Sequence, residues 1–410
     1  MAHEHDQLNR ASLDHCVKCT ICETQCPVAR VTPLFPGPKF VGPQAERFRD
    51  GESVDMSIDY CSSCGICTQA CPQGVKIAEL NTQARAVMKE EHMPLRDRLI
   101  SQTTLMGAMM QPVAPLANAA LGNSLIRGVI QATFKVAKDA PMPPAQKQTL
   151  AQWLRKRKAP TTPVTRGTVV FFHGCAGGYF EVQTSKASIE VLEHLGYEVL
   201  VPKQGCCGLA QQSNGLFDGA RRSVMALCDD LLAAGELTIV SASGSCTGML
   251  KHEAHTILGI DDPRLATVGT RIRDISEFLL ELYDADELDT SAFRETKVTI
   301  PYHQPCQVKS QGMGMPAKSL MQLIPGVTVE ESGQPCCGIA GTYGLKAEKY
   351  AIAQEVGRPV FEMVKATNPD LATCDTETCR WQIRKGSGVS TVHPIEVVHH
   401  ALGLGQLAGL

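Results

Sequence analysis

Eight cysteines near the beginning of the chain follow one spacing twice. The first run reads Cys16-x-x-Cys19-x-x-Cys22-x-x-x-Cys26-Pro27, and the second reads Cys61-x-x-Cys64-x-x-Cys67-x-x-x-Cys71-Pro72. Three thiolates on one tight loop can bind three irons of a [4Fe–4S] cube, and the other run then supplies the fourth thiolate. The spacing predicts a relay of two such clusters, one on Cys16, Cys19, Cys22 and Cys71, the other on Cys61, Cys64, Cys67 and Cys26.

Two other uses of these cysteines fit less well. A zinc site would need only four thiolates and prefers two CxxC pairs. A disulfide framework suits a small secreted domain, whereas this chain has 410 residues and a polar start at residues 1–10 in place of a signal peptide. We therefore expect iron–sulfur ligation.

A second set of cysteines occurs in two copies about 130 residues apart. Phe172-His173-Gly174-Cys175 is echoed by Tyr302-His303-Gln304-Pro305-Cys306. Cys206-Cys207-Gly208 is echoed by Cys336-Cys337-Gly338, and Gly244-Ser245-Cys246-Thr247 by Glu377-Thr378-Cys379-Arg380. The pattern indicates a duplicated unit whose two copies pack against each other.

The elements that must position these residues also alternate. Apolar runs at 168–172, 198–201 and 237–240 are typical of strands, and helical patterns at 187–195 and 220–233 lie between them. We predict an α+β chain: a helical two-cluster ferredoxin-like domain (1–95, with a helix at 78–91), a helical linker (96–165) and two α/β repeats (166–290 and 291–410).

Three further residues need an interpretation. His173 and His303 precede the leading cysteines of the repeats, and they could ligate metal, donate to a thiolate or bind quinone, or they could be structural residues at strand ends. Cys228 stands alone in an apolar helix, where a buried, inert thiol is the expectation.

The linker carries no Asp or Glu between Asp97 and Asp139, and Gly107, Pro112, Pro115, Gly122 and Gly128 should break it into short helices. Trp153 and the basic run at 155–158 follow it. This combination suits either a helix in a membrane interface or a hairpin packed on the protein's own core or on another protein of a complex. No apolar stretch of about 20 residues exists that would span a bilayer.

The net charge and the absence of several motifs limit the functions that this chain could have. Net charge is −3, which gives no reason to expect nucleic acid as a partner. No G-x-G-x-x-G follows a strand, and no Ser-His-Asp order or paired-carboxylate motif is evident. A relay with no organic redox cofactor of its own should take electrons from a flavin-bearing partner and pass them on.

The duplicated unit resembles the cysteine-rich "CCG" domain of heterodisulfide reductases, whose five thiolates can hold a [4Fe–4S] cluster. The resemblance implies one or two further iron–sulfur clusters, on Cys175, Cys206, Cys207 and Cys246 and on Cys306, Cys336, Cys337 and Cys379. The family's fifth cysteine is Ser243 in one copy and Thr376 in the other, and Cys374 is a candidate substitute. Four thiolates per copy also suffice for an ordinary cubane or for zinc.

Taken end to end, the chain resembles the C subunits of anaerobic glycerol-3-phosphate dehydrogenases. The longest motifs that carry the likeness are Pro335-Cys-Cys-Gly-Ile-Ala-Gly-Thr-Tyr-Gly344 and Glu377-Thr-Cys-Arg-Trp-Gln-Ile383. The resemblance implies flavoprotein A and B subunits that oxidise sn-glycerol 3-phosphate in anaerobic respiration. It also implies peripheral attachment to the cytoplasmic face of the cell membrane, with quinone as electron acceptor.

Three other functions stay open at this point. The repeats could form a catalytic site that reduces a disulfide, as in heterodisulfide reductases. The chain could serve a glycolate or lactate dehydrogenase, which use similar subunits, or it could be a structural adaptor that holds only zinc.

Overall fold

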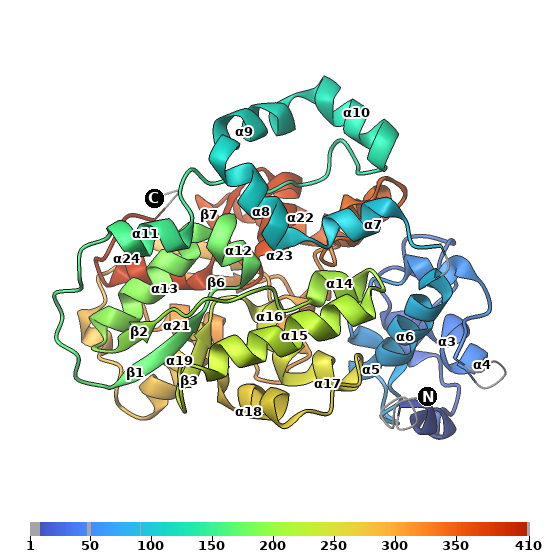
Figure 1. Cartoon of the computed structure of the whole chain (residues 1–410), viewed down its shortest axis with the longest axis horizontal. Coiled ribbons are helices and arrows are strands. Elements are labelled where there is room, and N and C mark those ends of the chain that lie inside the picture. The colour runs from blue at the N-terminus through green and yellow to red at the C-terminus, as the bar shows by residue number, and fades with distance from the viewer. Residues whose placement is uncertain (1–8, 47–50, 91, 408–410) are drawn as a thin grey trace.

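The computed structural model describes residues 9–46, 51–90 and 92–407 (Figure 1). A helical region at the N-terminus is followed by two parallel four-stranded sheets, which confirms the predicted fold class. Residues 1–8 of the polar start and Glu91, the expected end of the helix at 78–91, lie outside the described residues.

Short helices and turns make up the N-terminal region, on the right in Figure 1. Both cysteine runs bend at equivalent places through left-handed backbone, at Lys18 and Thr20 in the first and at Ser63 and Gly65 in the second. The elements are η1 (Ser12–His15), α2 (Ile21–Gln25), α3 (Pro38–Val41), α4 (Pro43–Glu46), η2 (Met56–Tyr60), α5 (Ile66–Gln69) and α6 (Ile77–Glu90).

The first α/β unit has the strand order β2-β1-β3-β4, with all neighbours parallel. Its strands are β1 (Thr168–Phe172), β2 (Glu198–Leu200), β3 (Thr238–Ser241) and β4 (Ile272–Asp274). Its helices are α12 (Gly174–Tyr179), α13 (Val182–His194), α14 (Leu209–Ser213), α15 (Phe217–Leu232), α16 (Gly244–Gly248), η4 (Met249–Glu253), α17 (Ala254–Thr256), α18 (Pro263–Arg271) and α19 (Ile275–Asp284).

The second unit repeats this topology with the order β6-β5-β7-β8, again parallel. Its strands are β5 (Val298–Tyr302), β6 (Val327–Glu331), β7 (Leu371–Thr373) and β8 (Ser390–Val392). Its helical elements are α20 (Cys306–Lys309), α21 (Pro316–Gln322), η6 (Tyr343–Leu345), α22 (Ala347–Thr367), α23 (Glu377–Ser387) and α24 (Pro394–Ala401), and η5 (Thr290–Ala292) precedes β5.

The central strands β1 and β5 are largely apolar and buried because both faces of each sheet are covered there. In β1, Val169 and Phe171 face a core shared by the two units, while Val170 and Phe172 face the core under α15 and α18. Helix α13 packs on α24, and α19 packs on α21. The duplicated units are therefore fused through a common core.

The linker forms α7 (Leu95–Ile100), α8 (Thr103–Met110), η3 (Gln111–Val113), α9 (Ala114–Gly122), α10 (Ser124–Phe134) and α11 (Leu150–Lys156). Gly107 and Gly128 lie inside helices, so the prediction that they break the chain was wrong. Gly107 is needed because α8 packs on α12, where a Cβ atom would lie 2.7 Å from Tyr179. In the described part of the chain, no helix is long and apolar enough to cross a membrane.

Candidate iron–sulfur centres and the cavity between them

The first group of thiols lies at the edge of the molecule. Cys16, Cys19, Cys22 and Cys71 line one hollow, so the last cysteine of the second run meets the first three of the first run. Burial raises the pKa of the Cys22 thiol to about 11, and Cys16 and Cys71 add to the shift. Cys19 is exposed. This grouping is the crossed pairing that the two-cluster spacing requires.

The second group lies deeper and completes the exchange. Burial raises the pKa of Cys26 to about 11, and Cys61 of the other run is the thiol that adds most to this shift. Burial also raises the pKa of Cys67 well above its usual value, with further contributions from Cys64, Cys61 and Cys26. Each run therefore gives its fourth cysteine to the other group.

In the first α/β repeat, four thiols meet where three neighbouring strands end. Cys175 follows β1, Cys206 and Cys207 follow β2, and Cys246 follows β3. The Sγ atoms of Cys207 and Cys246 are 3.1 Å apart. Hydrogen bonds from Cys175 and Cys207 lower the pKa of Cys206 well below its usual value. The carboxyl ends of parallel strands thus gather cysteines that are up to 71 positions apart in the sequence.

The second repeat gathers five thiols at the equivalent edge, and all five are buried. Cys306 follows β5, Cys336 and Cys337 follow β6, and Cys374 and Cys379 follow β7. Cys374 contributes to the raised pKa of both Cys337 and Cys379, so its sulfur belongs to this group. Cys374 therefore lies among the thiols of the second repeat although it does not have the CxxC spacing.

The second ferredoxin group adjoins the second repeat. After burial, Cys336 is the largest contributor to the raised pKa of Cys64, and Cys64 in turn adds to the raised pKa of Cys306. Cys26, Cys61, Cys306 and Cys336 also share one buried cluster. An electron on the second ferredoxin group would thus find the second repeat as its neighbour.

The two positions that lack the family's fifth cysteine face each other across the repeat interface. The Ser243 hydroxyl donates to the Glu377 carboxylate at 3.2 Å. Thr376 Oγ1 lies 3.2 Å from Ser245 Oγ. Both Ser243 and Thr376 are buried. These two positions therefore join the repeats through buried polar contacts.

The two predicted histidines differ in their surroundings. His173 Nδ1 lies 2.6 Å from the Gly174 carbonyl oxygen, and burial lowers the pKa of this ring to about 4. His303 Nδ1 lies 2.8 Å from Ser332 Oγ, while its Nε2 is buried with no hydrogen-bond partner among the described residues. Burial lowers the pKa of His303 to about 4, and Cys336 is close enough to oppose this shift. Of the two rings, His303 is the one near a thiol group.

A cavity of about 430 Å³ lies between the linker helices and the two repeats. One end reaches Cys175, Cys206, Cys207 and Cys246 of the first repeat, together with Cys306 and Cys64. Thr103 of α8 stands at this end, with Oγ1 3.7 Å from Cys206 Sγ. The remaining wall is largely apolar and includes Met106, Met110, Leu121, Ile130, Phe134 and Trp381.

Comparison with known proteins agrees with this arrangement. Residues 12–75 match the 4Fe-4S dicluster domain, and residues 169–251 and 300–384 each match the cysteine-rich (CCG) domain. The chain is 35% identical over 403 residues to the C subunit of the anaerobic glycerol-3-phosphate dehydrogenase of Escherichia coli K12, covering 96% of this chain and all of that one. The chain belongs to this C-subunit family.

More distant relatives cover a smaller share of the chain. The lactate utilization protein A of Bacillus subtilis is 27% identical over 56% of this chain and 98% of its own. The D subunit of the dihydromethanophenazine:CoB–CoM heterodisulfide reductase of Methanosarcina barkeri is 27% identical over 58% of this chain and 60% of its own. The predicted family is thus confirmed, and this member of the C-subunit family is an iron–sulfur protein.

The donor sets fit iron–sulfur clusters. Each of the four groups offers four or five thiols around a shared hollow or strand edge, and thiolates are the ligands that such clusters take. Within residues 9–46, 51–90 and 92–407, no group of three or more His, Cys, Asp or Glu side chains has the arrangement that would hold a single metal ion. Cys228, by contrast, is fully buried in α15, and burial raises its pKa to about 12.

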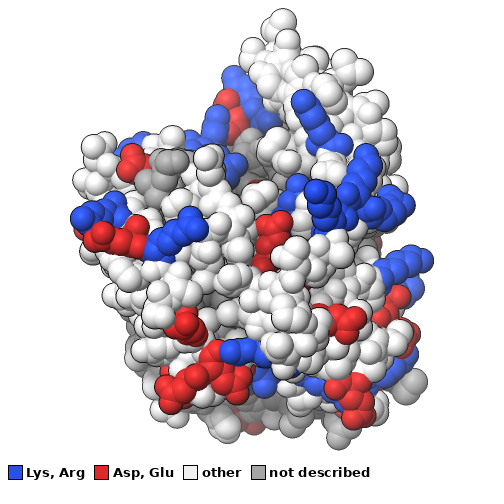
Figure 2. Space-filling model, turned by 90° about the vertical axis from the view of Figure 1, so that its left-hand side faces the viewer, with Lys and Arg blue, Asp and Glu red and all other residues white. Residues whose placement is uncertain are grey.

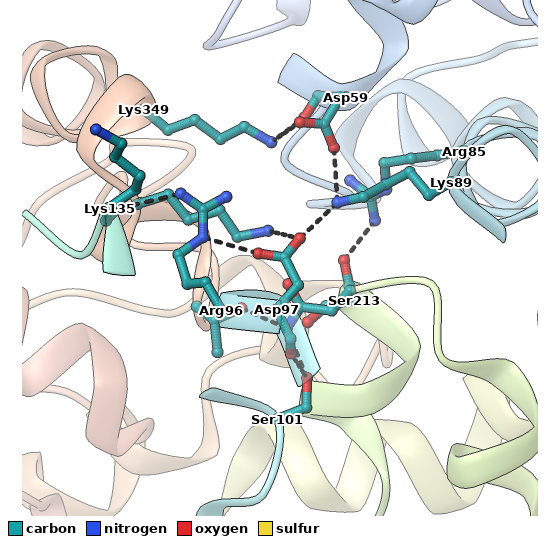
Figure 3. A network of polar contacts seen from close by, with 12 residues as sticks. Asp59, Arg85, Lys89, Arg96, Asp97, Ser101, Lys135, Ser213 and Lys349 are labelled. Atoms are coloured by element: carbon teal, nitrogen blue, oxygen red, sulfur yellow. Dashed lines mark hydrogen bonds and ion pairs between the residues drawn. The ribbon is translucent and has the colours of Figure 1, made fainter. Parts of the chain in front are cut away.

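Sequence reasoning missed the ion pairs that fix the ferredoxin-like region onto the repeats (Figure 3). Asp97 of α7 is fully buried, and its Oδ2 atom lies 2.6 Å from Lys89 Nζ and 2.8 Å from Lys346 Nζ. Burial would raise the pKa of Asp97, but Lys346 and Lys89 hold it well below its usual range. Asp59 pairs in the same way with Lys349. An acid at the border of an acid-free stretch was the sequence signal that could have pointed to Asp97.

Proposed function

We propose that this protein passes single electrons from a flavoprotein partner that oxidises sn-glycerol 3-phosphate to a quinone at the membrane. The observation that carries the proposal is the contiguous series of thiol groups. It begins at exposed Cys19, continues through the second ferredoxin group and the second repeat, and ends at the cavity beside the first repeat. Clusters held by these thiolates supply the one-electron carriers when they are bound.

The partner should dock where the series begins. Exposed apolar side chains occur on the segments around the first thiol group: Val17, Ile21, Val31, Leu34 and Phe40. Exposed apolar residues that lie near one another favour a protein interface. The proposal places the flavoprotein there, since its electrons would then enter through Cys16, Cys19, Cys22 and Cys71.

The opposite end suits peripheral contact with the cytoplasmic face of the cell membrane. The outer surfaces of α8 to α10 expose Leu105, Met109, Leu116, Leu125 and Val129. Figure 2 shows this lobe at the top of the molecule as largely uncharged, with Lys and Arg side chains gathered beneath it. An apolar lobe above basic side chains is the pattern that anionic membrane surfaces bind.

The part of the membrane prediction that used Trp153 needs correction. Trp153 packs against the core of the repeats, and the Arg157 guanidinium lies 4.8 Å from its ring centroid. Arg157 also pairs with Glu193 at 2.6 Å. Arg155, Lys156 and Lys158 are exposed, so the basic run stays available to lipid headgroups while the tryptophan does not.

The test is anaerobic purification together with the flavoprotein partner. We expect about eight irons per chain from the ferredoxin-like region and more if the repeats are loaded. Glycerol 3-phosphate should bleach the visible absorbance of the clusters. Bleaching by lactate or glycolate instead would overturn the substrate, and a folded, active preparation without iron would overturn the relay.

A second candidate is reduction of a disulfide at the first repeat, because its Cys175 and Cys206 open into the cavity. The reduced complex would then be reoxidised by a small disulfide rather than by quinone. Offering oxidised 2-mercaptoethanol and a quinone in parallel separates the two candidates. Membrane contact is tested separately by flotation with anionic vesicles, which should fail for L116E/L125E.

A further inference from the structure

The cavity beneath α8 to α10 combines features that together specify one kind of ligand. Its thiol-lined end touches the last group of the series, so a ligand there could exchange electrons with a cluster on the first repeat. Its long wall is made by the inner faces of α8, α9 and α10, through Met106, Met110, Leu121, Ile130 and Phe134. A ligand that fills it therefore needs a redox-active head and an apolar tail.

The thiol-lined end also carries polar groups. Glu253 lines the cavity and accepts hydrogen bonds from Gln212 and Gln307. The Oε1 atom of Gln307 is buried without a hydrogen-bond partner among the described residues. An unpaired buried acceptor is costly, and a hydroxyl group on the reduced form of a bound ligand would satisfy it.

The outer face of the same helices indicates that the ligand comes from a membrane, because that face is apolar and exposed. Leu116 is 73% exposed and Leu125 is 79% exposed, although both belong to the elements that wall the cavity. Arg127 holds the segment that follows α10, because its Nη2 atom donates hydrogen bonds to the carbonyl oxygens of Ala137 and Ala140. The lobe thus has two apolar faces, one that lines the cavity and one that is exposed on the surface of the protein.

We propose that this cavity is the binding site of a membrane quinone, with the head between the first-repeat thiols and Glu253 and the tail along α8 to α10. The inference rests on the proposed function. Reduction of a quinone to a quinol takes two electrons and two protons. The electrons are those that the flavoprotein removes from its substrate, and they arrive one at a time. Water supplies the protons, and the Glu253 carboxyl passes them to the quinone oxygens.

Tryptophan fluorescence gives a binding test that does not depend on turnover. Of the two tryptophans in the chain, Trp381 lines the cavity and Trp153 does not. Decylubiquinone should quench the fluorescence of W153F, in which Trp381 remains, and leave that of W381F nearly unchanged. Equal quenching of both variants, or of neither, would overturn the site.

A matched pair of variants tests the wall. M110F/I130F adds bulk inside the cavity, and L116F/L125F adds the same bulk on the exposed faces of the same lobe. We expect about tenfold weaker quinone binding for M110F/I130F, the size of a typical overpacking cost, and wild-type binding for L116F/L125F. Unchanged iron content and dithionite reduction would show that both chains are folded and loaded. Wild-type affinity of M110F/I130F would overturn the site.

A stopped-flow experiment separates failure of the site from failure of the function. The reduced wild-type complex is mixed with decylubiquinone, and ferricyanide serves as an acceptor that needs no cavity. If quinone reoxidises wild type and M110F/I130F equally fast, the site is wrong while the proposed function stands. If quinone fails to reoxidise wild type although ferricyanide succeeds, the proposed function falls, and the assignment of quinone to the cavity falls with it.

Discussion

The two cysteine repeats have the same topology and the same motif positions, yet they face different neighbours. The first cysteine of the CCG motif in the first repeat, Cys206, lies 3.7 Å from Thr103 of the linker and opens into the cavity. Its counterpart in the second repeat, Cys336, lies beside Cys64 of the ferredoxin-like region and is buried. The duplicated units thus contain equivalent sites. The segment that packs over each site determines its place in the proposed order of electron transfer.

The second repeat is the one that receives electrons under this interpretation, and the first is the one that releases them. The difference teaches that the cysteine motif alone does not define the role of a centre. The neighbours of each centre do: the ferredoxin-like region packs against the second repeat, whereas four of the six cysteines that line the cavity belong to the first repeat. Four experiments test this difference between the repeats, and the one with the greatest effect comes first.

The largest effect should come from breaking each repeat in turn. Cys336→Ser and Cys206→Ser should each lose about four irons and reduce quinone reduction to background, because each removes a thiolate ligand. With glycerol 3-phosphate and the partner present, the second-repeat centre should still be reduced in Cys206→Ser. The first-repeat centre should stay oxidised in Cys336→Ser. Electron paramagnetic resonance of the frozen samples distinguishes the two.

Cys228→Ser is the matched control for these variants, because Cys228 is buried like Cys336 but lies in the core of α15. It should keep its full iron content and its rate. Reduction of the first-repeat centre at the wild-type rate in Cys336→Ser would show that electrons bypass the second repeat, and the order proposed here would be wrong.

The attachment of the ferredoxin-like region to the second repeat should be the next most sensitive feature. Asp97→Asn leaves the buried ammonium group of Lys346 without its carboxylate and leaves Lys89 with Asp59 alone. Such a loss typically costs about 3–5 kcal/mol. Urea unfolding, followed by the visible absorbance of the clusters, should show a clear drop in midpoint.

The surface pair Arg221–Asp218 on the first repeat provides the contrast, since its charged groups are 3.1 Å apart but the Asp218 side chain is 82% exposed. Asp218→Asn should cost less than about 1 kcal/mol. Equal shifts for Asp97→Asn and Asp218→Asn would mean that the buried network does not hold the region in place.

The same network should make stability depend on pH. Burial lowers the pKa of Lys346 to about 7, and nearby Lys349 and Lys89 lower it further against the opposing effect of Asp97. Between pH 7 and about 10 the unfolded chain therefore binds more protons than the folded chain, so stability rises with pH. Lys346 alone should contribute a slope of at most about 1.4 kcal/mol per pH unit, with little change just below pH 7. Lys349, whose pKa burial lowers to about 8, adds to the slope above that pH.

Urea midpoints at pH 6.5, 7.5 and 8.5 measure this slope in the wild type. Lys346→Met keeps the length of the side chain and removes the titrating group, so its profile should be flatter over the same range. A falling wild-type profile, or equal slopes in the two chains, would contradict the assignment to Lys346.

The sequence predicted the parts of this molecule that depend on local spacing. The Cys-x-x-Cys runs, the apolar strand at 168–172 and the duplicated motifs each follow from a few consecutive residues, and the fold class is confirmed. What escaped prediction depends on packing between distant segments. Gly107 looks like a helix breaker until Tyr179 is seen against it, and Trp153 looks like a membrane anchor until α13 covers it.

The candidate site likewise has features that the sequence predicted and features that it did not. Pairing within the ferredoxin-like region could be inferred from spacing, but the proximity of Cys64 to Cys336 joins positions 272 residues apart. No period or motif encodes that contact. The cavity is likewise a product of four regions, since its wall needs the ferredoxin-like region, the linker helices and both repeats together.

The smallest effect should come from the interface where the two repeats meet. Ser245 Oγ lies 3.2 Å from Thr376 Oγ1, and both side chains are buried. Ser245→Ala removes this contact and leaves Thr376 without that partner, which should cost about 1 kcal/mol in urea unfolding. Iron content and cluster reduction should not change, because neither hydroxyl is a proposed ligand. If Ser245→Ala instead lost iron from one repeat only, these polar residues would act on a centre directly, and the repeats would differ in ligation as well as in cover.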